Sequence, residues 1–137
     1  MNEELVTFET AKLAKEKGFN EPVLAIYSGN QLGYIQEGDT LFKKWNHCTD
    51  ATYSAPTQSL LQKWLREVHN IDVVISPERY KSGVNYMVQA QKWDLNANEE
   101  IHPNFVVKGS YWFNDNHEHP TYEEALEKGL QEALKLI

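Results

Sequence analysis

The sequence predicts an α+β fold in which an antiparallel sheet of four or five strands carries three helices, packed mainly on one face. Residues 57–70 place apolar side chains at helical spacing, and residues 71–76 then alternate apolar and polar side chains as a strand does. Residues 121–137 show helical spacing again. Because 137 residues without a linker rich in Pro, Gly or Ser suit one domain, we expect a single α+β domain over residues 1–137.

Each predicted helix begins at a threonine whose hydroxyl can accept a hydrogen bond from a free backbone N–H group: Thr7, Thr57 and Thr121. The last of these belongs to a capping box that Glu124 completes. The first two helices should end at Gly18 and Asn70, residue types that adopt the left-handed conformation.

The second and third helices have the clearest apolar stripes. The stripe of the second helix consists of Leu60, Leu61, Trp64, Leu65 and Val68. The stripe of the third consists of Ala125, Leu126, Gly129, Leu130, Ala133, Leu134 and Ile137. A glycine inside a helix costs ~1 kcal/mol relative to alanine, so Gly129 predicts that this helix approaches the sheet closely.

Alternating side chains and turn residues predict the strands, which are residues 23–27, 32–36, 71–76, 84–91 and 105–113, with an edge strand near Tyr53. The first two should form a hairpin around residues 28–31. Pro77 is expected to end the strand before it, because proline has no backbone N–H group to donate. Lys81-Ser82-Gly83 then turns the chain, so residues 84–91 should run antiparallel to residues 71–76.

The overall charge is acidic, with a net value of −7. The acidity opposes nucleic-acid binding, although residues 43–92 carry seven Lys or Arg against four Asp or Glu. The only cysteine, Cys48, excludes an internal disulfide and fits a reducing compartment. The first residues are acidic, and no apolar run reaches the ~20 residues of a membrane span. We therefore expect a cytoplasmic protein that does not bind a membrane.

Two histidines before the last helix are weak candidates for metal ligands. His117 and His119 point the same way if the backbone there is extended, and imidazole nitrogen binds zinc or iron. No third ligand stands at a recognisable spacing, so we predict no metal and no cofactor. Cys48 follows His47 without a base aimed at it. The sequence therefore predicts a protein that is not an enzyme, with a metal-dependent enzyme as the lesser alternative.

Nucleic-acid binding is the main alternative function, because the segment 43–92 mixes basic and aromatic side chains. Within it, Arg79, Tyr80 and Lys81 combine charges that bind phosphate with a ring that can stack on a base. Helix, three strands and helix is also the element order of double-stranded-RNA-binding domains. Those domains place basic residues at the start of the last helix, where this chain has Glu123 and Glu124.

The favoured function is a protein-interaction surface on the sheet. Three large side chains are expected to point away from the core face: Met87, Trp93 and Trp112. If they are exposed together, they form a patch that suits another protein or a second copy of the chain. These three residues are the candidate binding residues, and no catalytic residue is predicted.

Three segments, Val6–Phe19, Ala55–His69 and Tyr122–Ile137, together resemble a group of short proteins of gut Bacteroides and their phages. The resemblance covers the three helices, about a third of the chain. The group has no known activity, cofactor or site, so no functional residue is carried over. The resemblance implies a small accessory protein, encoded by a phage or a prophage.

Overall fold

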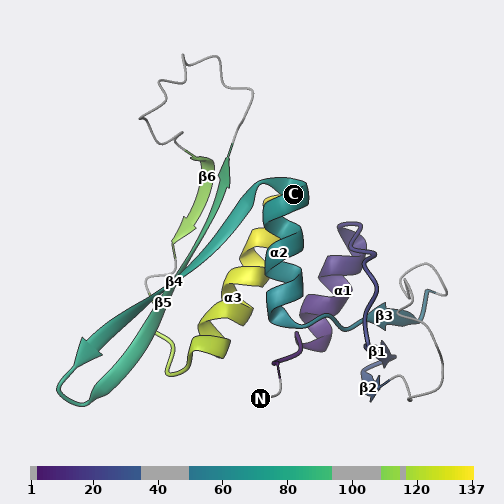
Figure 1. The fold of residues 1–137 in the computed structure, drawn as a ribbon, viewed down its shortest axis with the longest axis horizontal. Helices are drawn as coiled ribbons and strands as arrows, with labels where there is room; N and C mark the ends of the chain where they lie inside the picture. Colours follow the sequence, from purple (N-terminus) through teal and green to yellow (C-terminus); the bar gives the residue numbers. More distant parts are fainter. Residues whose placement is uncertain (1–2, 35–49, 94–108, 115–116) are drawn as a thin grey trace. The chain divides into compact units, whose positions relative to one another are not determined.

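A computed structural model describes residues 3–34, 50–93, 109–114 and 117–137, and of residues 109–114 it describes the backbone alone. Three helices and six strands occur in these ranges (Figure 1). In chain order they are α1 (Phe8–Glu16), β1 (Ala25–Ser28), β2 (Gln31–Tyr34), β3 (Thr52–Ser54), α2 (Gln58–His69), β4 (Ile71–Tyr80), β5 (Gly83–Trp93), β6 (Gly109–Asn114) and α3 (Tyr122–Leu134). The predicted α+β class with three helices and antiparallel pairing is confirmed.

The chain divides into two compact units, residues 1–61 and residues 62–137. In the first unit, β1 lies between β2 and β3 and pairs antiparallel with both. Gly29, with a φ of 60°, lies in the two-residue turn of the β1–β2 hairpin. The hairpin and the edge strand near Tyr53 were both predicted; residues 35 and 36 of the predicted second strand lie outside the described residues.

Aromatic packing holds α1 against the first sheet. The ring of Phe8 meets the rings of Tyr27 and Tyr53 edge to face, at centroid distances of 5.5 and 5.4 Å. The hydroxyl of Tyr27 donates to the carbonyl of Val6 at 2.8 Å, and Nζ of Lys15 donates to the carbonyl of Thr52, also at 2.8 Å. The helix α1 therefore packs against β1 and β3 of this sheet.

In the second unit, β5 lies between β4 and β6 and pairs antiparallel with both. The register places Val73 opposite Ala90 and Asp72 opposite Gln91. The helix α3 runs along one face of β5, with Tyr122 at its start next to Tyr86; just after its end, the carbonyl of Leu136 accepts a hydrogen bond from Nζ of Lys92. Figure 1 shows the β4–β5 hairpin extending past the start of this helix.

At Gly129, α3 lies close against the sheet. A Cβ atom at this position would lie 2.4 Å from Cγ2 of Val88 and 2.6 Å from Cγ1 of Val73. The apolar stripe around it is buried, as the sequence predicts: Ala125, Leu126, Gly129, Leu130, Ala133 and Leu134. The close approach predicted from Gly129 is thus confirmed.

The helix boundaries agree with the predicted capping residues. The hydroxyls of the three threonines accept from the backbone N–H groups of Thr10, Leu60 and Glu124, at 3.4, 3.2 and 3.1 Å. Gly18 and Asn70 have φ values of 90° and 56°, the left-handed conformation expected at both helix ends.

Two local predictions are wrong. Pro77 does not end its strand, because β4 continues to Tyr80 with Pro77 opposite Tyr86. Val68 is not part of the buried stripe of α2, since 56% of its surface is exposed, whereas Leu61, Trp64 and Leu65 are buried. Val68 belongs to the last turn of the helix, just before the chain turns into β4.

The described strands form two three-stranded sheets, where the sequence predicts one sheet of four or five strands. Both edges of β1 are occupied by β2 and β3, and both edges of β5 by β4 and β6. The helices are distributed accordingly, with α1 against the first sheet and α3 against the second. Alternation within a strand fixes its faces but not its neighbours, so it could not distinguish one sheet from two.

Candidate binding face

The register of the β4–β5 hairpin defines its two faces. Residues opposite one another in an antiparallel pair share a face, and successive residues alternate between faces. One face packs on α3 and contains the buried Ile71, Val73, Val88 and Ala90. We call the other the free face; it consists of Asp72, Val74, Ser76, Glu78 and Tyr80 of β4 and Asn85, Met87, Gln89, Gln91 and Trp93 of β5.

The free face is open to solvent over much of its length. Val74 is 48% exposed and Tyr80 is 51% exposed, which is high for large apolar side chains. Ser76, Glu78 and Gln89 are also exposed, and the remaining members are half-buried. The two faces of one hairpin therefore differ sharply, since the face toward α3 has buried residues on both strands.

Charges are segregated between the two faces. Both acidic residues of the hairpin strands, Asp72 and Glu78, lie on the free face. Both basic residues of these strands, Arg79 and Lys92, lie at positions of the opposite face. The strand β6 (Gly109–Asn114) adds no charged residue to the sheet. The strand residues of the free face thus carry negative charge only.

The two acidic side chains of the free face are held differently. Asp72 accepts a hydrogen bond at Oδ2 from the indole Nε1 of Trp93, at 2.7 Å. The exposed side chain of Glu78 forms neither a hydrogen bond nor an ion pair with the described part of the chain. Asp72 is therefore held in one orientation, whereas the carboxylate of Glu78 is available to bind a ligand.

A polar cluster secures the far end of the hairpin. Glu118 accepts hydrogen bonds from the hydroxyl of Tyr80 and from Nδ2 of Asn85, the second at 2.9 Å. These two hydrogen bonds, the one from Tyr80 above all, lower the pKa of Glu118. The hydrogen bond between Tyr80 and Glu118 is also the main cause that raises the pKa of Tyr80. The backbone of His119 also exchanges two hydrogen bonds of 2.8 Å with Tyr86. The segment before α3 therefore stabilises the hairpin from the side.

The outer edge of β4 is a poor template for another strand. The backbone groups of Tyr86 point to His119, so Pro77 opposite it occupies a position whose N–H would face outward. Proline removes that donor, as it commonly does on edge strands. Farther along, Nε2 of Gln62 donates to the outward carbonyl of Val73 at 2.8 Å. These two features leave fewer free backbone groups for another strand at this edge of β4.

The three predicted binding residues lie on β5 and β6 of the second sheet. Met87 and Trp93 are half-buried members of the free face, on the side away from α3. The backbone of Trp112 pairs with Gln91, another member of that face, and its side chain lies outside what the structure describes. Sequence reasoning missed Asp72 and Val74, although their alternation with Ile71 and Val73 placed them on the mixed face.

The structure divides the residues of the nucleic-acid alternative between different places. Tyr80 lies on the free face and Arg79 at a position of the opposite face, while Lys81 lies in the turn. The phenol of Tyr80 is already a donor to Glu118. Next to these cations stand the negative charges of Glu78 and Glu118, which repel phosphate. The three residues do not form one basic surface.

Among the described residues, the weak metal candidates His117 and His119 gain no further ligand. His119 forms the backbone bridge to Tyr86, and His117 is exposed two residues earlier. Within the described ranges, no group of three or more His, Cys, Asp or Glu side chains could hold a metal ion. His47 and Cys48, the neighbours considered above for nucleophilic chemistry, lie outside those ranges.

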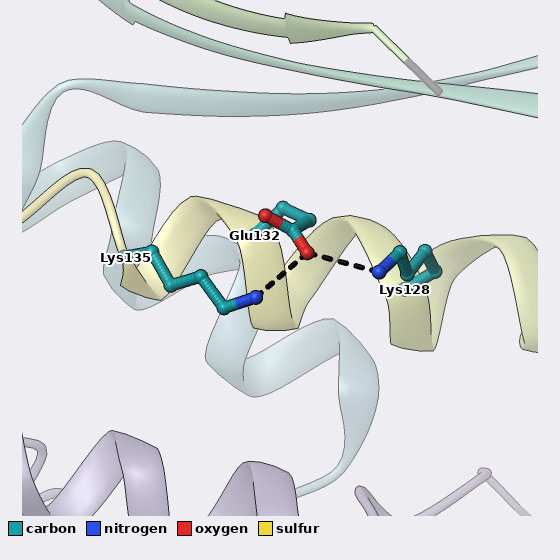
Figure 2. Close-up of polar contacts among 3 residues, drawn as sticks. All are labelled: Lys128, Glu132 and Lys135. Atoms are coloured by element: carbon teal, nitrogen blue, oxygen red, sulfur yellow. Dashed lines mark hydrogen bonds and ion pairs between the residues drawn. The ribbon is translucent and has the colours of Figure 1, made fainter. Parts of the chain in front are cut away.

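A compact ion-pair group occurs on α3. Figure 2 shows Glu132 between Lys128 and Lys135, with Oε1 at 2.9 and 2.8 Å from the two Nζ atoms. Burial acts to raise the pKa of Glu132, but the hydrogen bonds and positive charges of Lys135 and Lys128 together outweigh it, and the net effect is a lowered pKa. This carboxylate is neutralised within its own helix, in contrast to Glu78.

None of the helices in the described part of the chain has both the length and the apolar character that crossing a bilayer requires. No protein-family model, curated protein or solved structure matches the chain.

Proposed function

We propose that the chain is a small non-catalytic module that binds another protein, or a second copy of itself, through the free face of the β4–β5 hairpin. One observation carries the proposal: Val74 and Tyr80 are half exposed on a sheet whose opposite face is buried under a helix. The second face of this sheet holds valine, methionine and aromatic side chains. Covering them with a partner removes apolar surface from water, which stabilises the complex.

Interaction through the edge of the sheet is the less favoured mode. Strand addition needs a row of outward N–H and C=O groups. At the outer edge of β4, Pro77 lacks the donor and Gln62 already occupies the carbonyl of Val73. The proposal therefore assigns binding to side chains of the free face, among them Met87 and Trp93.

We further propose that the protein is encoded by a phage or prophage and acts in the cytoplasm. The resemblance of its helical segments to small proteins of gut Bacteroides and their phages supports an accessory protein of a phage or prophage. A single cysteine supports action in the cytoplasm, where thiols stay reduced. Such a protein would act by contact with a host or phage component.

Site-specific photo-crosslinking in the native host tests the proposal. A photoreactive amino acid replaces Val74 on the free face or, as the matched control, Val68 on α2, which is a valine of similar exposure. We expect a defined protein adduct from position 74, of another protein or of the chain itself, and none from position 68. Equal adducts from both positions, or none from position 74, would contradict binding through this face.

A further inference from the structure

We propose that the free face binds a cationic amphipathic helix of a partner protein, with apolar side chains of that helix on Val74 and Met87 and its Lys or Arg side chains at Asp72 and Glu78. The inference rests on the proposed function and specifies the chemistry of the partner. Charge complementarity is its main argument.

The charge pattern selects a positively charged partner. The two charges that the strands carry on the free face are both carboxylates, and the basic Arg79 and Lys92 belong to the opposite face. Glu118, bound to Tyr80 and Asn85, adds a third negative charge beside the hairpin end. The carboxylates of the free face would repel an acidic partner. Lys or Arg side chains of a partner would instead form favourable electrostatic interactions at both ends of the face.

The dimensions of the face suit a helix of about three to four turns. Asp72 and Glu78 are six residues apart on one strand, which corresponds to ~20 Å at ~3.3 Å per residue. A helix covers that length in roughly 13 residues, at ~1.5 Å per residue. A comparable helix lies on the other face, where α3 has 13 residues; its first residue Tyr122 packs on Tyr86, and Leu136, two residues after its end, accepts a hydrogen bond from Lys92. A second helix on the free face would complete the same layered arrangement.

Two other occupants fit less well. A second copy of the chain, placed face to face, would set Asp72 and Glu78 against carboxylates of the same sign. Nucleic acid would bring phosphates to the same carboxylates. Both occupants are outcomes that the experiment below detects.

Three synthetic helical peptides of equal length and identical apolar stripe test the inference. Their polar positions carry Lys, Gln or Glu, so that they differ in charge alone. Binding to the whole chain is followed by NMR through the indole N–H of Trp93 and the methyl groups of Val74 and Met87, at low and at high salt. Because the chain has a net charge of −7, a cationic peptide could also bind elsewhere. The variants Asp72→Asn and Glu78→Gln are therefore compared with Glu16→Gln, an exposed acid on α1.

We expect the Lys peptide to shift the signals of the free face and the Glu peptide to leave them unchanged. Together, Asp72→Asn and Glu78→Gln should weaken binding of the Lys peptide about five- to tenfold at low salt, the effect of two partly exposed charge pairs. Glu16→Gln should change it less than about twofold.

The contrary outcomes are distinct. Equal binding of the Gln and Lys peptides at the free face would overturn the inference and leave the proposed function standing. If no peptide shifts the face, the inference is also overturned, and the crosslink from Val74 decides the proposed function separately. Signals of the face that shift with the concentration of the chain alone would show that a second copy is the occupant. Shifts on addition of a single-stranded oligonucleotide would show that nucleic acid is.

Discussion

The indole Nε1–H of Trp93 donates a hydrogen bond to Oδ2 of Asp72 across the β4–β5 pair, at 2.7 Å. The bond joins the last residue of one strand to the second residue of its neighbour, and both side chains are half-buried on the free face. The backbone N–H of Trp93 also donates to the carbonyl of Asn70 at 2.9 Å. Trp93 is thus fixed at both its backbone and its ring, which gives one end of the free face a defined geometry.

Replacement of Trp93 by phenylalanine should lower the free energy of unfolding by about 1 kcal/mol. A hydrogen bond to a charged acceptor contributes somewhat more than this when buried, but the pair is half-exposed. Asp72→Asn should cost less, because its amide oxygen can still accept from the indole. Urea unfolding of both variants measures the difference. No loss of stability in Trp93→Phe would mean that the bond contributes nothing to folding.

Gly129→Ala should destabilise the protein by about 1–2 kcal/mol, even though alanine is the better helix former by ~1 kcal/mol. The new Cβ would lie 2.4 Å from Val88 and 2.6 Å from Val73, so α3 or the sheet has to move. Gly33→Ala is the matched control, because no atom lies within 4 Å of a Cβ placed there.

A double-variant cycle separates this clash from other effects of the new methyl group. If contact with Val88 is the cause, Gly129→Ala combined with Val88→Ala should cost less than the sum of the single changes. Additive costs would place the strain elsewhere. Thermal or urea unfolding of the four proteins supplies the numbers.

The helix ends and the contact at Gly129 could be predicted from the sequence because each depends on local chemistry. A threonine hydroxyl caps the first turn of its own helix, and Gly18 and Asn70 end their helices in the left-handed conformation. A glycine within the apolar stripe of a helix marks a position where a neighbouring element packs closely. The faces of β4 and β5 followed likewise from alternation. The antiparallel pairing of β4 with β5 followed from the turn at Lys81-Ser82-Gly83. The division into two sheets and the continuation of β4 through Pro77 did not follow, because a period of two encodes neither.

The candidate site was predictable in part for the same reason. Met87 and Trp93 could be assigned to the free face by alternation within β5. The bond between Trp93 and Asp72 and the bonds to Glu118 join residues 21, 33 and 38 positions apart in the sequence. The register of the sheet brings Trp93 to Asp72, and the bridge between His119 and Tyr86 brings Glu118 to the hairpin.

His69 should make the stability of the protein depend on pH below ~6.5, the ordinary pKa of histidine. Burial, and then the charge of Lys92, lower the pKa of His69 in the folded state. The unfolded chain therefore binds the proton more readily, so the stability is fully present above pH ~6.5 and is lost as the pH falls through the folded-state pKa. Unfolding experiments across this range measure the slope.

His69→Gln should remove this part of the slope. Nε2 of His69 is buried without a hydrogen-bond partner among the described residues, so protonation gains no acceptor there. NMR titration of the ring in the folded protein gives its pKa directly. A value at or above 6.5 would contradict the prediction.

Acid should loosen the end of the β4–β5 hairpin through Glu118. Hydrogen bonds from Tyr80 and Asn85 lower the pKa of this carboxyl, so its contribution is present above the ordinary pKa of glutamate and is lost as the pH falls through the lowered value. Amide protection factors of Tyr86 and His119, which exchange backbone hydrogen bonds, should fall in that range.

Glu118→Gln should make the protection of these amides insensitive to acid in that range, whereas Glu16→Gln should leave the response unchanged. If protection falls equally in the parent protein and in both variants, general acid unfolding and not Glu118 loosens the hairpin.

Pro77→Val should increase self-association through the outer edge of β4. Valine restores an N–H group at a position that faces away from β5, next to the outward groups of Ile75 and Arg79. Valine also favours extended backbone, so the hairpin itself should be no less stable. Sedimentation velocity at rising concentration should show dimers or larger species for the variant at concentrations where the parent shows none. Pro120→Val, an exposed proline outside the strands, is the control and should behave as the parent does. If Pro77→Val sediments like the parent, the edge is protected by other groups, and Gln62 at the carbonyl of Val73 is the next to replace.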